Sequence, residues 1–384
     1  MASRQQVRIG VIGGGLMGRE LAAAVGRWDA LQDHPCRPAL TAVCDPNPDV
    51  LRWFDRVSTV DLRTDDHREL LDAHVDVVYL AVPHHLHEAL YLDTVAAGKD
   101  FLGEKPFGID AGAAGRIVAA IDAGDVFARC SSEMPYFPGA QAVFDDLVGG
   151  RVGRIVEAEA AFLHSSDLDL AKPINWKRQA ATCGAIGVMG DLGMHVAHVP
   201  LRLGWRPSRV YAVLQDLVPE RPDGHGGTAR CDTWDNATLL TDVPHPRGAF
   251  PLTLSTKRIA PGEMNTWRLR VLGMDGGVEF STATPKTVRT FTVRDGAQIW
   301  EHREVGSQSV FPTITGGIFE FGFTDAILQM WAAFLAERAG ALGDRFGCAT
   351  PAEALASHEL FAAALRSAAS GAAEALDVAP LPAG

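Results

Sequence analysis

The stretch Val7-Arg8-Ile9-Gly10-Val11-Ile12-Gly13-Gly14-Gly15-Leu16-Met17-Gly18 decides the fold, because a buried-strand pattern leads directly into a glycine-rich turn and then a helix. In the pattern Gly13-x-Gly15-x-x-Gly18, the first glycine permits the tight turn and the second lets the backbone approach a pyrophosphate. The third allows close helix–sheet packing, and N–H groups at the helix N-terminus face the anion. The stretch therefore predicts a dinucleotide site contacted by Gly13, Gly15, Leu16, Met17 and Gly18.

The next predicted strand, residues 40–44, ends in Asp45. A carboxylate at this place accepts hydrogen bonds from the ribose diol of an adenosine. It would repel a 2′-phosphate, and the residues that follow are Pro46-Asn47-Pro48 rather than an arginine. The expected cofactor is NAD rather than NADP. The strand–turn–helix context disfavours the alternative of a glycine turn with no ligand.

Length and composition are typical of a soluble enzyme with two domains. A chain of 384 residues exceeds the usual size of one hydrophobic core. The net charge of -12 argues against nucleic-acid and anionic-membrane partners. The six cysteines are far apart without a C-x-x-C pair, which favours reduced thiols in the cytoplasm. Residues 7–12 suit a first strand better than a signal peptide, and no stretch is long and apolar enough to span a bilayer.

Strand and helix patterns alternate through the first third of the chain, with strands at residues 40–44, 75–82, 100–103 and 126–130. This alternation predicts an α/β domain, residues 1–130, with a doubly wound parallel sheet of the Rossmann type. Asp110 is the expected N-cap of a helix that runs to Ala123, and Gly124 ends it.

The pattern changes after about residue 131. Alternating runs at 155–163, 210–217, 237–241, 252–256, 267–272 and 287–293 predict one large, mainly antiparallel sheet in an α+β domain, residues 131–384. Asp275-Gly276-Gly277 marks a hairpin turn. Thr350-Pro351-Ala352-Glu353 is a capping box that opens a helix to about Ser370, and the last dozen residues are expected to form a loose tail.

Two further clusters contain candidate catalytic residues. The first is Gly103-Glu104-Lys105-Pro106-Phe107, directly after a strand of the parallel sheet, where the carboxyl end faces the ligand crevice. The second is the run from Gly190 to His198, which opens a predicted helix. Asp191 and His195 are four residues apart in that run, so they share one face of the helix.

With these motifs the chain resembles the glucose–fructose oxidoreductase and inositol dehydrogenase family, known as Gfo/Idh/MocA. The resemblance covers nearly the whole length and includes the glycine turn, Asp45, Ala81-Val82-Pro83 followed by His87, Glu104-Lys105-Pro106, and Asp191-x-Gly-x-His195. It implies that Lys105, Asp191 and His195 form the catalytic set. It also implies that Pro83, His87, Glu104 and Lys105 lie at the cofactor, and that the second sheet builds a homodimer or homotetramer.

The chemistry expected of the catalytic set is oxidation of a secondary alcohol, or its reverse. Hydride goes to the nicotinamide while a base within hydrogen-bond reach takes the hydroxyl proton. His195 is the expected base because its ordinary pKa lies near neutrality. Lys105 would stabilise the developing alkoxide, and Asp191 would hold a neighbouring hydroxyl or orient the pair.

Six further residues are candidates for substrate contact. An aromatic face suits the apolar face of a sugar ring, and charged groups suit its hydroxyls. Each aromatic in the set is also a candidate for the core, and its arginine for a surface or interface. Asp167 and Asp169 are expected in a solvated loop without a role. The six candidates are Glu133, Tyr136, His164, Trp176, Arg178 and His198.

One position departs from the family pattern, in which an aspartate commonly follows the catalytic histidine by three residues. Here His198 stands at that place. Asp191, His195 and His198 then share one helical face, a spacing suited to a metal ion, with His164 as an extra ligand. The catalytic roles already account for two of these residues, so no metal is expected. His84, His85 and His87 are likewise expected to flank a helix start rather than bind metal.

The sequence therefore predicts an NAD-dependent dehydrogenase acting on a cyclic polyol, sugar or glycoside. Two alternatives stay open. In one, the enzyme retains its NAD and oxidises a glycoside transiently, to exchange redox equivalents with a keto sugar or to cleave the glycosidic bond. In the other, the protein is a non-catalytic NAD-binding sugar sensor, although a sensor needs no proton-transfer group.

Overall fold

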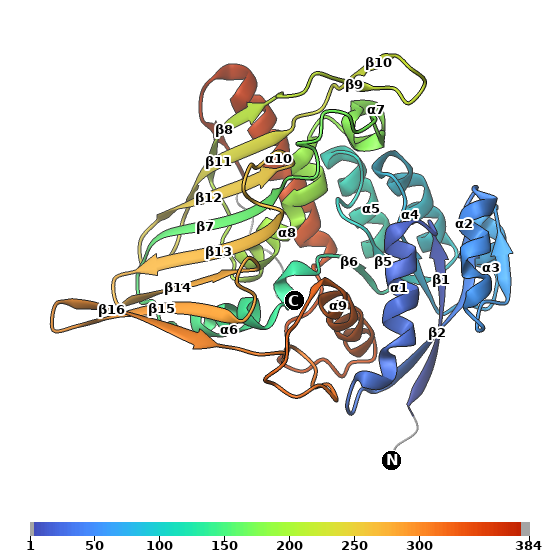
Figure 1. Ribbon diagram of the computed structural model, residues 1–384, viewed down its shortest axis with the longest axis horizontal. Helices are drawn as coiled ribbons and strands as arrows, with labels where there is room; N and C mark the ends of the chain where they lie inside the picture. The colour runs from blue at the N-terminus through green and yellow to red at the C-terminus, as the bar shows by residue number, and fades with distance from the viewer. Residues whose placement is uncertain (1–3, 378–384) are drawn as a thin grey trace.

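The computed structural model describes residues 4–377, which form two sheets with helices packed between and around them (Figure 1). The first sheet has six parallel strands in the order β3-β2-β1-β4-β5-β6, the doubly wound arrangement predicted from the sequence. Its strands are β1 (Gln5–Ile12), β2 (Cys36–Cys44), β3 (Leu62–Thr64), β4 (Val77–Leu80), β5 (Asp100–Gly103) and β6 (Ala128–Cys130).

Crossover helices connect these strands, as parallel neighbours require. Asp110 caps α5 by accepting a hydrogen bond from the backbone N–H of Ala113, and Gly124 follows the last turn, as predicted. The α-helices of this part are α1 (Leu16–Gly26), α2 (Pro48–Trp53), α3 (His67–Asp72), α4 (His87–Ala96) and α5 (Ala111–Ala123).

The second sheet has nine strands and is antiparallel except for one pair, β7 and β12. The β13–β14 turn at Met274-Asp275 lies at the start of the predicted hairpin signal. In spatial order the strands are β16 (Ala297–Glu304), β15 (Thr287–Arg294), β14 (Gly276–Ser281), β13 (Asn265–Gly273), β7 (Ile155–His164), β12 (Phe250–Lys257), β11 (Asn236–Val243), β8 (Arg209–Gln215) and β17 (Glu374–Ala375). A separate two-stranded ribbon pairs β9 (Glu220–Pro222) with β10 (Thr228–Arg230).

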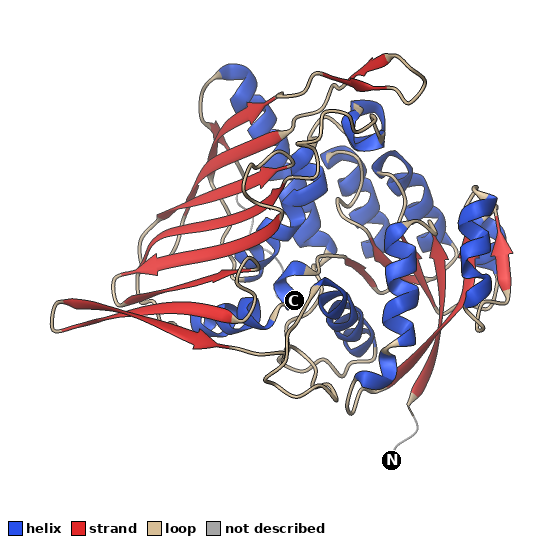
Figure 2. Ribbon diagram, viewed as in Figure 1, coloured by secondary structure: helices blue, strands red, loops and turns tan. Residues whose placement is uncertain are grey.

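Helices cover one face of the nine-stranded sheet, and Figure 2 shows them between that sheet and the parallel one. They include α6 (Pro138–Val148), α8 (Val188–Arg202) and α10 (Pro351–Ser370), which pack on β14, on β7 and β12, and on β8 respectively. The opposite face is open, so residues alternate between buried and exposed along strands such as β8 and β11. The short helix α7 spans Ala180–Cys183.

Two late helices pack back on the parallel-sheet half. α9 (Phe323–Arg338) lies against α1, and α10 contacts both α5 and α8. The capping box of α10 forms as predicted, because Thr350 Oγ1 accepts from the Glu353 N–H at 3.1 Å and Glu353 Oε2 accepts from the Thr350 N–H at 2.7 Å. Gly371 then ends the helix with φ +69°. The predicted tail is corrected in part, since Glu374–Ala375 pairs with β8, and residues 378–384 lie outside the described residues.

Candidate active site

The glycine turn between β1 and α1 has the backbone that a pyrophosphate site needs. Gly13 has φ +98°, and a Cβ there would lie 2.3 Å from the carbonyl oxygen of Ala81. A Cβ at Gly18 would lie 2.5 Å from the carbonyl oxygen of Gly13, whereas Gly15 faces open space. Gly15 is the N-cap of α1, with no side chain capping the helix, and Leu16 beside it is 71% exposed. The free N–H groups of this helix end fit an anion.

Asp45 lies beside this turn at the carboxyl end of β2. Its Oδ2 accepts a hydrogen bond from the N–H of Gly14 at 2.9 Å, and its Oδ1 accepts from the N–H of Asn47 at 2.9 Å. The carboxylate is therefore fixed next to the glycine turn, where a ribose diol is expected. A shallow pocket adjoins it, lined by Pro46, Pro48, Leu51, Arg63, Thr64, Asp65 and Glu69. These residues fit the adenosine half of NAD.

An ion pair between Lys105 and Asp191 connects the two halves of the molecule. Lys105 follows β5, and its Nζ donates to the carbonyl oxygen of Asp191 at 2.5 Å and to Asp191 Oδ1 at 3.1 Å. Asp191 lies in the first turn of α8, so the ion pair joins the end of the parallel sheet to the helix that covers the second sheet. Burial alone would lower the pKa of Lys105, but Asp191 and Glu104 outweigh it and raise that pKa. Lys105 is therefore a charged hydrogen-bond donor.

Two further cations, absent from the sequence-based prediction, surround Asp191. Lys177 Nζ donates to Asp191 Oδ1 at 2.9 Å, and Arg258 Nε donates to Asp191 Oδ2 at 3.4 Å. Burial opposes ionisation of Asp191, but Lys177, Lys105 and Arg258 outweigh it and hold its pKa well below the ordinary value. Asp191 is thus ionised and fixed in place.

His195 lies one helical turn beyond Asp191 and is buried. Its Nδ1 lies 3.4 Å from Ser132 Oγ and 3.8 Å from Glu133 Oε2. Its backbone carbonyl accepts from the indole N–H of Trp267 at 2.7 Å, which fixes this part of α8 on β13. Burial, followed by the charge of Lys105, lowers the pKa of His195 well below its ordinary value. The imidazole is therefore neutral at pH 7 and able to accept a proton.

Glu104 and His87 hold the loops on which the predicted cofactor contacts lie. Glu104 Oε1 accepts from the Tyr79 hydroxyl at 2.5 Å, and the Tyr91 hydroxyl donates to the Glu104 carbonyl at 2.8 Å. The ring nitrogens of His87 lie 2.7 Å from the Pro106 carbonyl oxygen and 2.9 Å from that of Val82. His87 is completely buried and holds both loops through these contacts. Pro83, which precedes the short helix His84–Leu86, is half-buried.

Trp176 and His164 lie beside the charged cluster. The Trp176 ring meets the His84 ring edge-on at 4.8 Å, and Lys177 Nζ lies 5.6 Å from its centroid. His164 ends β7 and is half-buried, and burial lowers its pKa to about 4. The charges of Asp191, Lys177 and Lys105 also act on it. The structure therefore brings these two predicted substrate residues to the same region as Lys105 and Asp191.

The structure corrects the prediction that Tyr136 and Arg178 contact substrate. Tyr136 is completely buried and donates its hydroxyl to Cys348 Sγ at 3.3 Å. Arg178 is 1% exposed and forms ion pairs with Asp167 and Asp235. The expectation of a solvated Asp167 is therefore also wrong, because a buried arginine requires this carboxylate as its partner.

His198 is likewise corrected from a substrate contact to a core residue. It is completely buried, its ring centroid lies 4.8 Å from that of Phe346, and neither ring nitrogen has a hydrogen-bond partner within residues 4–377. Burial lowers its pKa to about 3. In the same described residues, no group of three or more histidine, cysteine or acidic side chains is arranged to hold a metal ion.

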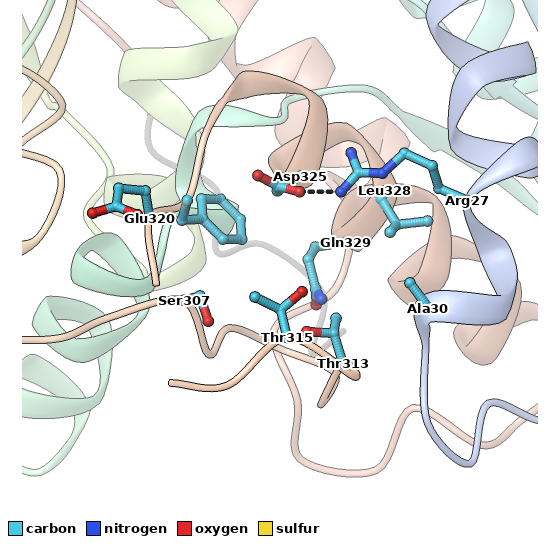
Figure 3. Close-up of a pocket in the computed structure, with 10 residues that line it drawn as sticks. Arg27, Ala30, Ser307, Thr313, Thr315, Glu320, Asp325, Leu328 and Gln329 are labelled. Carbon is cyan, nitrogen blue, oxygen red and sulfur yellow. Dashed lines mark hydrogen bonds and ion pairs between the residues drawn. The ribbon is translucent and has the colours of Figure 1, made fainter. Parts of the chain in front are cut away.

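A separate pocket lies between the end of α1 and the start of α9 (Figure 3). Arg27 and Asp325 form an ion pair across it, and Gln329 is held by the backbone of Phe311. None of its lining residues belongs to the predicted site. The lining residues are Arg27, Ala30, Ser307, Thr313, Thr315, Glu320, Phe321, Asp325, Leu328 and Gln329.

A parallel sheet with a glycine turn, a carboxylate at the end of β2 and a lysine at the end of β5 defines an NAD-binding oxidoreductase. Residues 7–129 match the family model described as the oxidoreductase family with an NAD-binding Rossmann fold, and residues 142–279 match the GFO/IDH/MocA C-terminal domain. The chain belongs to the GFO/IDH/MocA family. No helix within residues 4–377 is long and apolar enough to cross a membrane.

Named relatives include several dehydrogenases. Levoglucosan dehydrogenase of Pseudarthrobacter phenanthrenivorans is 25% identical over 294 residues, which cover 72% of this chain and 74% of the relative. Inositol 2-dehydrogenase 4 of Saccharopolyspora erythraea is 31% identical over 119 residues, which cover 31% and 33%. The solved structure of levoglucosan dehydrogenase with NADH and levoglucosan has a TM-score of 0.87 at 21% identity, covering 97% of this chain and 100% of that chain. At this identity, the structural likeness establishes the shared fold.

Proposed function

We propose that the protein is a dehydrogenase that transfers hydride between NAD and a secondary alcohol of a cyclic polyol, sugar or glycoside. The observation that carries this proposal is the convergence of Lys105, Asp191 and His195 where the end of β5 meets α8. The names of the relatives, which act on a sugar and an inositol, support the substrate class. Residues 1–130 would form the cofactor domain and residues 131–384 the substrate and assembly domain.

Each group of the set has a protonation state that suits alcohol oxidation. NAD, when bound, supplies the hydride acceptor. His195, neutral in its buried place, takes the hydroxyl proton. Lys105 donates a charged hydrogen bond to the reacting oxygen and stabilises the alkoxide as it develops. Asp191 keeps Lys105 charged and orients it, and Trp176 offers an aromatic face to the sugar ring.

The test is spectroscopic. Purified protein is incubated with NAD or NADP and a panel of levoglucosan, inositols, aldoses and glucosides, while reduced nicotinamide is followed. We expect turnover with NAD and loss of turnover in Lys105→Ala and His195→Ala. NAD released only on denaturation, with no net turnover, would instead favour an enzyme that retains its cofactor. Cofactor binding that leaves every substrate unchanged would contradict both and favour a sensor.

We also propose a homodimer or homotetramer in the cytoplasm, assembled through the open face of the nine-stranded sheet. Tyr211, Val213 and Leu240 are 43%, 51% and 52% exposed on neighbouring strands of that face. A second copy of the sheet would cover them. Leu240→Glu would then lower the mass measured by light scattering, and an unchanged mass would contradict this interface.

A further inference from the structure

Glu133 is a buried carboxylate that lies near Nδ1 of His195. It precedes the short helix Met134–Tyr136 and is 5% exposed. Its Oε2 lies 3.8 Å from His195 Nδ1, and Ser132 Oγ lies 3.4 Å from the same nitrogen. His195 Nε2 has no hydrogen-bond partner within residues 4–377. Nδ1 of the ring therefore faces Ser132 and Glu133, and Nε2 is left for a substrate hydroxyl.

The other charged groups around Glu133 already have partners. Glu104 accepts the Tyr79 hydroxyl, and the Lys105 ammonium is bonded to Asp191. The Glu133 carboxylate, by contrast, makes no side-chain hydrogen bond to another residue in the range 4–377. Glu133 is therefore the carboxylate near His195 that is available to exchange a proton with it.

The two groups differ in how readily they hold a proton. Burial and the Lys105 charge lower the pKa of His195 well below its ordinary value, so an imidazolium there is costly. Burial, with Glu104 as the next cause, raises the pKa of Glu133 to about 7, although Lys105 opposes this rise. Near neutral pH, Glu133 therefore holds a proton more readily than His195 does.

We propose that Glu133 is the positioning residue that receives a proton from His195 during turnover, an inference that rests on the dehydrogenase function proposed above. In the oxidation, the substrate hydroxyl gives its proton to His195 Nε2, and His195 Nδ1 gives its proton to Glu133 Oε2. Bound NAD would accept the hydride from the substrate carbon. The products are a ketone, NADH and a protonated Glu133 carboxyl, which releases the proton to water, and reduction runs in reverse.

The step needs only a small movement. A charged N–H···O bond is about 2.8 Å long, so Nδ1 and Oε2 must approach by about 1 Å from 3.8 Å. Catalytic hydrogen bonds are often long in the free enzyme and shorten when substrate binds.

The decisive variant is Glu133→Gln, which keeps the size of the side chain and removes its proton affinity. We expect kcat to fall about 10- to 100-fold with KM within about threefold. In the wild type, kcat should decrease as the pH falls below about 7. This acid limb of the pH profile should be absent from Glu133→Gln. The matched control is Asp146→Asn, a buried carboxylate of α6 paired with Arg151 and Arg303, which should keep the limb.

Two results would overturn the proposal, and they are distinguishable. If the wild-type protein oxidises no sugar or polyol, the dehydrogenase function and the role of Glu133 fail together. If turnover is present but Glu133→Gln keeps the same pH limb, or only raises KM, the role of Glu133 fails alone.

A second measurement covers the case in which Glu133→Gln does not fold. In the full-length wild-type protein labelled with ¹⁵N-histidine, His195 should stay neutral with its proton on Nδ1. Its resonances should shift with a midpoint near pH 7 as the adjacent carboxyl titrates. Resonances that do not respond to pH around neutrality would overturn the proposal without any variant.

Discussion

The ammonium of Lys105 is bonded twice to one residue of the opposite half of the molecule, to the backbone carbonyl of Asp191 at 2.5 Å and to its carboxylate at 3.1 Å. Lys105 follows a strand of the parallel sheet and Asp191 lies on a helix of the other half, so the pair links the two halves. Neither the parallel-sheet half nor the other half contains both Lys105 and Asp191.

Replacement of Lys105 by alanine should therefore affect chemistry more than cofactor binding. We expect kcat to fall about 100- to 1000-fold, the cost of removing one donor to a developing oxyanion. NADH affinity, measured by fluorescence, should change little. Lys286→Ala is the control, because Lys286 pairs with Glu320 at the surface. An equal loss in both variants, or intact turnover in Lys105→Ala, would contradict the assigned role.

Asp45→Asn should relax the preference for NAD. The variant removes the charge that repels a 2′-phosphate and weakens the bonds to the ribose diol, each worth about 1.5–3 kcal/mol when charged. We expect kcat/KM for NAD to fall about 10- to 100-fold and the ratio of NADP to NAD use to rise. The control is Asp49→Asn, whose side chain is exposed in the first turn of α2. An unchanged ratio would show that Asp45 does not select the cofactor.

Arg178→Ala should act on stability, because Arg178 lies in the core rather than against substrate. Its loss leaves the buried carboxylate of Asp235 without a charged partner, and it leaves Asp167 with only the partly exposed Lys172. We expect the free energy of unfolding to fall by about 3–5 kcal/mol. Lys172→Ala removes a partly exposed partner of Asp167 and should cost at most about 1 kcal/mol. Urea unfolding at pH 7 measures the stability of both variants. If Arg178→Ala changes KM without loss of stability, Arg178 contacts substrate after all.

His198 should make the folded state sensitive to acid. Its folded pKa is about 3 and its unfolded pKa is about 6.5, so between these values the unfolded chain binds a proton that the folded chain does not. The free energy of unfolding therefore falls as pH falls, by about 1.4 kcal/mol per pH unit for this one group. Between pH 6.5 and pH 5, the free energy of unfolding of His198→Leu should fall by about 2 kcal/mol less than that of the wild type.

Exposed His302 on β16 provides the control for this effect. His302→Leu should leave the dependence of unfolding on pH as it is in the wild type. If His198→Leu has the same slope as the wild type, the histidine is protonated in the folded protein and the assignment is wrong.

The features that sequence predicts well here are those set by near neighbours in the chain. The glycine turn, the capping box of α10 and the spacing of Asp191 and His195 each depend on a few consecutive residues, and each is present in the structure. The Asp295-Gly296 turn between β15 and β16 is an equally local hairpin signal.

The features that sequence misses depend on topology and burial. Because β12 runs parallel to β7, Arg258 and His164 reach the same edge of the sheet, and neither strand alone indicates that direction. Lys177, which bonds to Asp191, is next to the buried Arg178, whose ion pairs with Asp167 and Asp235 hold this segment in place. Helix α9 is apolar on nearly every face, so it carries no periodic signal of an exposed side.

The packing of α9 on α1 and of α10 on α5 has a consequence for biosynthesis. The cofactor half is translated first, yet the surfaces of α1 and α5 stay uncovered until residues beyond 323 leave the ribosome. During this interval, the apolar side chains of α1 that join the core cluster containing Trp331 are exposed to other nascent chains. The nucleotide-binding half therefore completes its packing only after the C-terminal helices are made, even though its sequence is the earliest part to be made.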